Sequence, residues 1–202
     1  MRSRWSDRPV NRSLRLLSGL VLFGLGLALL VQAQLGVDPW TVLTQGVAVR
    51  TGLSLGTISV IISLLLLLIW IPLGERPGLG TVANALVVGP VLDLGVAILP
   101  APDVLLLRVL YLVLALLVIA FATGLYVGAG WGPGPRDGLM TGLARRGMPV
   151  FAARMLIEGT VLVGGWLLGG TVGLATVVFA LTIGPLVGRA LPRLALPPTA
   201  TT

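Results

Sequence analysis

Charged side chains are rare inside the long apolar runs of this sequence, so those that occur there are the first candidates for chemistry. Arg154 and Glu158 are four residues apart, which places them on one face of a helix. A carboxylate at mid-membrane depth is costly unless it is paired or protonated. Glu158 is therefore our first candidate, with Arg154 as its partner. The pair acts either as a structural ion pair or as a proton- or substrate-coupling site.

Two further acids and a basic residue follow glycine- and proline-rich breaks. Arg136 and Asp137 come after the run Gly132-Pro133-Gly134-Pro135, where free backbone amides and a guanidinium can hold an anion. The alternative is that Arg136 anchors the chain at the cytoplasmic surface while Asp137 offsets a helix dipole. Asp38, before Pro39-Trp40, is either a helix N-cap or part of the same kind of site, and Trp40 beside it is a further candidate.

Other polar residues within or at the ends of the apolar runs line a path or bridge neighbouring helices by hydrogen bonds. They are Gln32, Gln34, Asn84 and Tyr126. Asp93 and Arg108 both fall near the outer ends of predicted spans, where we expect them to pair.

Composition excludes several kinds of chemistry. The 202 residues include no Cys and no His, and the sequence has no Lys. Thiolate or imidazole chemistry, an HExxH zinc site and a Schiff base are therefore excluded, and we expect no cofactor, no metal site and no enzyme. With 56% hydrophobic and 10% charged residues, the chain is predicted to be an integral membrane protein. The net charge of +7 is explained by the cytoplasmic Arg bias of membrane proteins, without nucleic acid as a partner.

The apolar runs predict an all-α bundle with six membrane crossings, since each is close to the ~20 residues that a crossing needs. The first run is too long for the ~7–15-residue core of a signal peptide, so we expect it to remain as a helix. The predicted spans are Leu16–Val37, Thr51–Gly74, Leu79–Leu99, Val104–Gly128, Pro149–Leu168 and Thr171–Gly188.

Two segments between these runs are too short to cross. Pro39–Arg50 and Pro135–Arg146 would each be about 18 Å long as helices, against a hydrocarbon core of about 30 Å. Both begin with a capping residue and a proline, and both have an apolar and a polar face. We expect each to lie in the membrane interface or to dip into the membrane against protein.

The distribution of Arg predicts that both termini are cytoplasmic. With the N-terminus inside, all Arg residues except Arg50 and Arg108 lie on or near the cytoplasmic side. Eight crossings would give the same balance, so the length of the two short segments decides for six. Residues 1–12 and 191–202 are then cytoplasmic tails.

An internal repeat relates residues 13–99 to residues 104–190 at an offset of 95–96 residues. Three crossings in each unit place the two units in opposite orientations, as in the inverted repeats of many secondary transporters. The binding site is then expected at the matched breaks, Gly36–Arg50 and Gly128–Arg146. The matching segments are Gly36–Gly46 with Gly132–Gly142, Leu73-Gly74 with Leu168-Gly169, Gly78–Thr81 with Gly173–Thr176, and Gly89-Pro90 with Gly184-Pro185.

The segments Gly36-Val37-Asp38-Pro39-Trp40, Thr51–Thr57, Gly89–Asp93 and, most specifically, Gly132–Met140 together resemble the bacterial YczE/YitT-type integral membrane proteins. The resemblance covers nearly the whole chain outside the termini. It implies a multi-pass protein of the bacterial inner membrane and supplies no binding residue or substrate.

The leading functional hypothesis is a small secondary transporter or permease with a path between the inverted halves. Its partners would be the lipid bilayer and an unidentified small solute, and a homodimer is possible. The alternative is a membrane scaffold or an assembly or regulatory protein without transport activity. A channel shares the symmetry but conducts without saturation, and a membrane enzyme fits least because the usual acid–base and metal-binding residues are absent.

Overall fold

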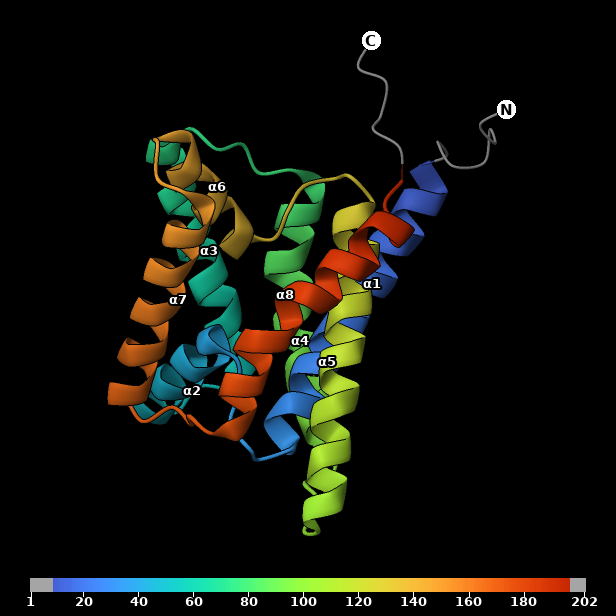
Figure 1. The fold of residues 1–202 in the computed structure, drawn as a ribbon, viewed down its shortest axis with the longest axis vertical. Coiled ribbons are helices and arrows are strands. Elements are labelled where there is room, and N and C mark those ends of the chain that lie inside the picture. The colour runs from blue at the N-terminus through green and yellow to red at the C-terminus, as the bar shows by residue number, and fades with distance from the viewer. Residues whose placement is uncertain (1–8, 197–202) are drawn as a thin grey trace.

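The computed structural model describes residues 9–196, which form eight helices and no strand (Figure 1). Six of the helices are long and apolar enough to cross a membrane, as predicted. These six are α1 (Pro9–Gln32), α3 (Leu55–Leu73), α4 (Leu79–Ile98), α5 (Leu105–Gly128), α7 (Val150–Leu167) and α8 (Leu174–Leu194). The other two are the predicted short helices, α2 (Pro39–Thr51) and α6 (Pro135–Arg145).

Local sequence signals set the ends of α2 and α3. Asp38 caps α2, Pro39 takes its first position, and Gly52 ends it in the left-handed region with φ 72°. The Ser54 side chain accepts a hydrogen bond from the Thr57 N–H at the start of α3. These caps satisfy backbone groups that a helix end would otherwise leave unpaired.

The first and last spans differ from the predicted boundaries. α1 begins at Pro9, inside the predicted tail 1–12, and its first two turns include the charged residues Arg12 and Arg15. It ends at Gln32, before the predicted Val37, because Gln34 and Gly36 take positive φ angles of 54° and 101°. α8 continues beyond the predicted Gly188 to Leu194. Residues 1–8 of the predicted N-terminal tail, with Arg2, Arg4 and Arg8, and residues 197–202 of the predicted C-terminal tail lie outside the described residues.

The six long helices alternate in direction along the bundle axis (Figure 1). α1, α4 and α7 run one way, and α3, α5 and α8 run the other way. α1 and α5 pack together on the side of the bundle away from α3 and α7, with α4 against α1 and α8 against α5 (Figure 1). α2 packs mainly on α7, and α6 packs mainly on α3, so each short helix contacts a long helix from the other half of the chain.

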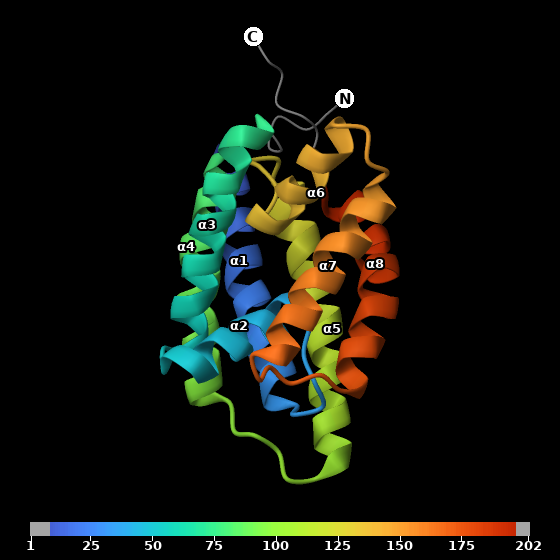
Figure 2. The ribbon, with the colours of Figure 1, turned by 90° about the vertical axis from the view of Figure 1, so that its left-hand side faces the viewer.

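The two short helices lie at opposite ends of the bundle, between the side formed by α3 and α4 and the side formed by α7 and α8 (Figure 2). α2 is not an amphipathic surface helix, because both its apolar Trp40 and Val42 and its polar Thr41 and Thr44 are buried. Of the two predicted arrangements, α2 adopts the one in which a short helix packs within the protein.

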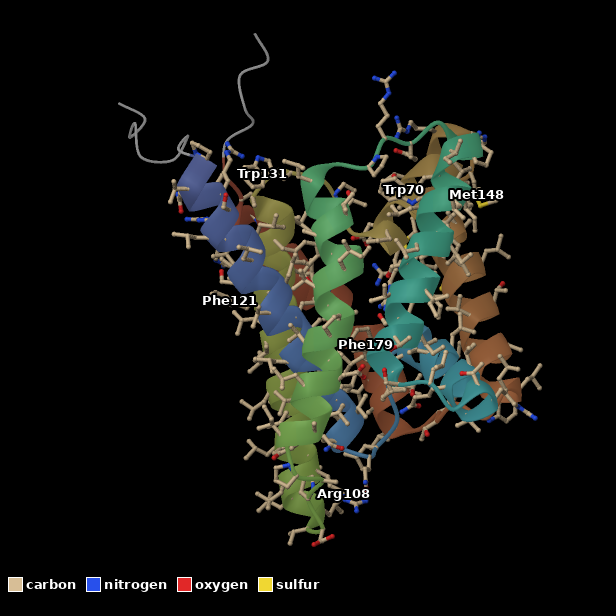
Figure 3. All side chains as sticks on the ribbon, turned by 180° about the vertical axis from the view of Figure 1, so that it is seen from behind. Trp70, Arg108, Phe121, Trp131, Met148 and Phe179 are labelled. Carbon is tan, nitrogen blue, oxygen red and sulfur yellow. The ribbon has the colours of Figure 1, made fainter. Side chains whose placement is uncertain are left out.

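Apolar side chains cover the outer surface of the long helices. Leu68, Leu106, Phe121 and Trp166 are exposed, and the core between α1 and α5 is built from residues of the same kind (Figure 3). A surface of this type is suited to lipid rather than to water.

The predicted pairing of Asp93 with Arg108 is wrong. The Asp93 carboxylate accepts hydrogen bonds from the Ser54 hydroxyl (2.6 Å) and from the Gly56 N–H (2.7 Å), while Arg108 Nε donates to the Pro102 carbonyl (2.8 Å). The first turn of α3 has backbone N–H groups without partners inside the helix, and Asp93 is placed to accept one of them. Arg108 lies at the end of the bundle opposite to Trp131 and Met148 (Figure 3).

Candidate functional site

One cavity of about 360 Å³ lies among the helices, and every helix or its cap contributes to its lining. This volume falls within the range of small-molecule sites, roughly 300–1,000 Å³. All eight residues predicted as substrate or coupling candidates line it: Asp38, Trp40, Asn84, Tyr126, Arg136, Asp137, Arg154 and Glu158. The fold therefore gathers into one place residues that are spread over most of the chain.

Asp38 enters the cavity from the start of α2 and is almost fully buried, with 2% of its surface exposed. Its Oδ2 accepts hydrogen bonds from the N–H groups of Trp40 (3.2 Å) and Thr41 (3.3 Å), so the predicted N-cap is confirmed. The Thr41 hydroxyl donates to the other carboxylate oxygen. Asp38 also lies 3.6 Å from Arg136 Nη1, so it is a cap and an ion-pair partner at once.

Arg136 joins the two short helices across the cavity. Its guanidinium lies 5.3 Å from the centre of the Trp40 ring, in addition to its contact with Asp38. A guanidinium over an indole face is held by a cation–π attraction. Arg136 of α6 thus contacts both the carboxylate of Asp38 and the aromatic ring of Trp40, at the start of α2.

Trp70 of α3 positions the first turn of α6. Its Nε1 donates a hydrogen bond to the Pro135 carbonyl (2.9 Å), and Gly138 lies directly against its ring, where any larger side chain would overlap the indole. Trp70 is fully buried. This contact fixes the height and rotation of α6, and with them the directions of Arg136 and Asp137.

Three polar groups surround Gly134 at the start of α6. A Cβ atom at Gly134 would lie 3.3 Å from both the Asp137 Oδ2 and the Tyr126 hydroxyl, and 3.6 Å from the Asn84 amide nitrogen. Burial raises the pKa of the Asp137 carboxyl, although the nearby charges of Arg136 and Arg154 oppose this rise. Asp137 lies in the first turn of α6, as predicted, so a carboxylate already faces the end of the helix at which an anion would bind.

The predicted pairing of Arg154 with Glu158 on α7 is confirmed, with Nε 2.9 Å from Oε1. The Arg154 side chain is 42% exposed and the Glu158 side chain 23% exposed. Both line the cavity, so the ion pair belongs to the same site as the residues of α2 and α6.

Two serines of α3, Ser59 and Ser63, line the cavity and were not predicted. The predicted repeat contained the signal needed to find them. At the offset of about 95 residues they correspond to Arg154 and Glu158 on α7. Gln32, in contrast, donates to the Val96 (3.0 Å) and Leu99 carbonyls, and it does not line the cavity.

The six apolar helices, and the cavity between them with its charged residues, define a multi-pass integral membrane protein with a site of mixed charge. The chain belongs to the family of unknown function DUF6198, whose sequence profile matches residues 10–191.

Two bacterial relatives cover most of the chain. An uncharacterized protein of Haemophilus influenzae is 42% identical over 186 residues, which are 92% of this chain and 85% of the relative. The uncharacterized membrane protein YczE of Bacillus subtilis is 31% identical over 180 residues, which are 87% of this chain and 83% of the relative. The resemblance to YczE-type membrane proteins is thereby confirmed. No solved structure matches this chain at a significant level.

Proposed function

We propose that the protein is a small secondary transporter of the bacterial inner membrane, with both termini cytoplasmic, and that its solute path runs through the cavity between two inverted halves. The observation that carries the proposal is that both halves line one cavity at corresponding positions. Ser59 corresponds to Arg154, Ser63 to Glu158, and Val88 to Ile183 at an offset of about 95 residues, and all six residues line the cavity.

Corresponding backbone contacts between the halves support the inverted repeat. The Ala175 N–H donates to the Leu35 carbonyl (2.8 Å), and the Gly80 N–H donates to the Trp131 carbonyl (2.8 Å). At the repeat offset the two contacts exchange, because Leu35 corresponds to Trp131 and Gly80 to Ala175. Each loop before a short helix is thus held by the start of a long helix from the other half, and corresponding helices run in opposite directions (Figure 1).

A difference between the halves supports alternating access. The backbones of α3 and α4 approach closely at Gly56 and Gly89. The corresponding residues of the second half are Phe151 and Gly184, but Phe151 is 74% exposed and a Cβ atom at Gly184 would meet no atom within 4 Å. α7 and α8 are therefore separated at the positions where α3 and α4 are in contact. Exchange of these two arrangements would open the cavity to the other side of the membrane.

The charge distribution supports the proposed orientation. Arg145 and Arg146 are bound near the end of α3, where Arg146 Nη1 donates to the Leu73 carbonyl (3.1 Å), and α1 begins and α8 ends at this end of the bundle (Figure 1). Arg50 and Arg108 belong to the opposite end. An excess of Arg on one side is typical of the cytoplasmic face.

The test is solute flux into proteoliposomes for wild type, Glu158→Gln and the control Asp103→Asn, which removes an exposed acid in the α4–α5 loop. We expect saturable flux that Glu158→Gln reduces at least tenfold and that Asp103→Asn leaves unchanged. Normal flux in Glu158→Gln would remove this residue from the mechanism. Absence of flux for every solute class, together with a stoichiometric protein partner, would favour the scaffold alternative.

A further inference from the structure

The charged groups of the cavity do not balance. Two guanidiniums face three carboxylates, and each guanidinium already has a partner: Arg136 with Asp38 at 3.6 Å and Arg154 with Glu158 at 2.9 Å. Among the described residues, Asp137 is the cavity carboxylate that forms no ion pair within 4 Å. If all five groups are ionised, the site therefore carries one excess negative charge.

Within residues 9–196, no other helix supplies a positive charge to the lining of the cavity. The charged and titratable groups that line the cavity with Asp137 are Asp38 before α2, Tyr126 of α5, Arg136 of α6, and Arg154 and Glu158 of α7. The described residues of α1, α3, α4 and α8 contribute only apolar, hydroxyl, amide and glycine groups to the lining. The excess charge is thus a property of the whole cavity and not only of α6.

An unbalanced carboxylate inside a membrane protein is costly, and a proton or a bound cation removes that cost. An anionic solute would meet guanidiniums that already have partners, together with the unpaired carboxylate. A neutral solute would leave the excess charge in place. The aromatic rings of Phe23, Tyr126 and Phe179 also line the cavity, and aromatic faces attract organic cations.

We propose that Asp137 binds either a proton or a monovalent organic cation, and that the protein exchanges one for the other across the membrane. When the cation enters from one side, the protonated Asp137 carboxyl loses one proton to that side and the carboxylate pairs with the cation. At the other side one proton returns to Asp137 as the cation leaves. The exchange moves one positive charge in each direction and changes no covalent bond other than O–H. This inference rests on the proposed transport function and names its solute class and coupling ion.

The groups beside Asp137 suit both states of this exchange. The Tyr126 hydroxyl and the Asn84 amide nitrogen lie around the same point as the Asp137 carboxyl, next to Gly134. Hydroxyl and amide groups can donate to the carboxylate, and the hydroxyl can also accept from the protonated carboxyl. The absence of a side chain at Gly134 leaves this point free.

The experiment measures cation binding and proton release by the purified full chain in detergent. Isothermal titration in buffers of different ionisation enthalpy counts the protons released. The cationic probes are choline, tetraethylammonium and benzylammonium. The neutral and anionic probes, 3,3-dimethylbutan-1-ol and 3,3-dimethylbutanoate, match the shape of choline. We expect at least one cation to bind with release of about one proton below the pKa of Asp137. In that range its affinity should fall about tenfold for each unit by which the pH is lowered. The matched alcohol and carboxylate should not bind.

Variants separate the role of Asp137 from a general effect of charge. Asp137→Asn should lose at least tenfold in cation affinity and should release no proton, while Asp137→Glu should restore both in part. Asp103→Asn, outside the cavity, should behave as wild type. Size-exclusion and thermal unfolding profiles establish that each variant is folded.

Two results would overturn the inference: no cation in the panel releases a proton, or Asp137→Asn binds cations as wild type does. These failures differ from failure of the proposed function. If the proteoliposomes transport a neutral or anionic solute, the transport proposal stands and proton–cation exchange is rejected. If the proteoliposomes transport no solute while cation binding and proton release are intact, the transport proposal is rejected instead.

Discussion

The Arg154–Glu158 pair allows a structural role to be distinguished from a coupling role. Glu158→Gln leaves the Arg154 guanidinium without its partner at 2.9 Å. Loss of one partner costs about 3–5 kcal/mol when an ion pair is fully buried. At a solvent-exposed surface the cost is about 0–1 kcal/mol. Because Arg154 is 42% exposed and Glu158 23% exposed, we expect an intermediate loss of about 1–2 kcal/mol in the free energy of unfolding.

The double variant Arg154→Gln/Glu158→Gln removes both charges and leaves neither uncompensated. It should therefore be more stable than Glu158→Gln alone, by roughly 1 kcal/mol. Charge balance also predicts its effect on the site. In the single variant the freed Arg154 can neutralise Asp137, so cation binding is lost, whereas the double variant leaves Asp137 unpaired and regains part of the binding.

The assay is reversible unfolding of wild type, Arg154→Gln, Glu158→Gln and the double variant in mixed micelles, with cation binding measured on the same samples. A purely structural pair would change stability and leave the affinity of each folded variant unaltered. The reasoning is refuted if the double variant is less stable than Glu158→Gln and also binds cations no better.

Three further predictions concern α6, the pH dependence of stability and the open side of the cavity. Trp70→Phe should reduce stability by about 1 kcal/mol through loss of the hydrogen bond to Pro135, with the loss read from thermal or denaturant unfolding; an unchanged midpoint would contradict the contact. Because burial raises the pKa of Asp137, protonation stabilises the folded state, so stability should fall as the pH rises from the ordinary carboxyl range to the raised value. Asp137→Asn should remove that slope, and a slope that persists would assign it to another group. The sequence contains no Cys, so Met155→Cys with Gly184→Cys gives one thiol pair across α7 and α8, at the positions that correspond to the touching residues Val60 and Gly89. Its disulfide yield should rise when solute closes this side, and an equal yield with and without solute would argue against closure.

The candidate site could be predicted in large part because its residues are unusual within apolar runs. A charge such as Glu158, a break such as Gly134-Pro135 or an acid before a proline such as Asp38 is visible in the sequence, and each is costly or conformationally restricted in a membrane. The serines of α3 were missed because a hydroxyl in an apolar helix can satisfy itself on the preceding turn and therefore gives little signal.

Residue pairs could be predicted only within one helix. Arg154 and Glu158 are four residues apart, and helix geometry alone brings them together. The partners of Asp93 and Arg136 depend instead on how separate helices pack. Asp93 binds Ser54 and Gly56. Arg136 binds Asp38 and Trp40.

By itself the sequence determined the membrane class, the six helices that are long and apolar enough to cross, and the two short helices. Lipid leaves a backbone no partner except its own, so the length of an apolar run decides what can cross. Only the tertiary structure decided that α2 packs on α7 and α6 on α3, and that the eight candidate residues from distant segments line one cavity. The physical reason is that helix packing depends on the combined shapes of several faces, and single glycines such as Gly56 and Gly138 determine where two backbones or an indole can meet.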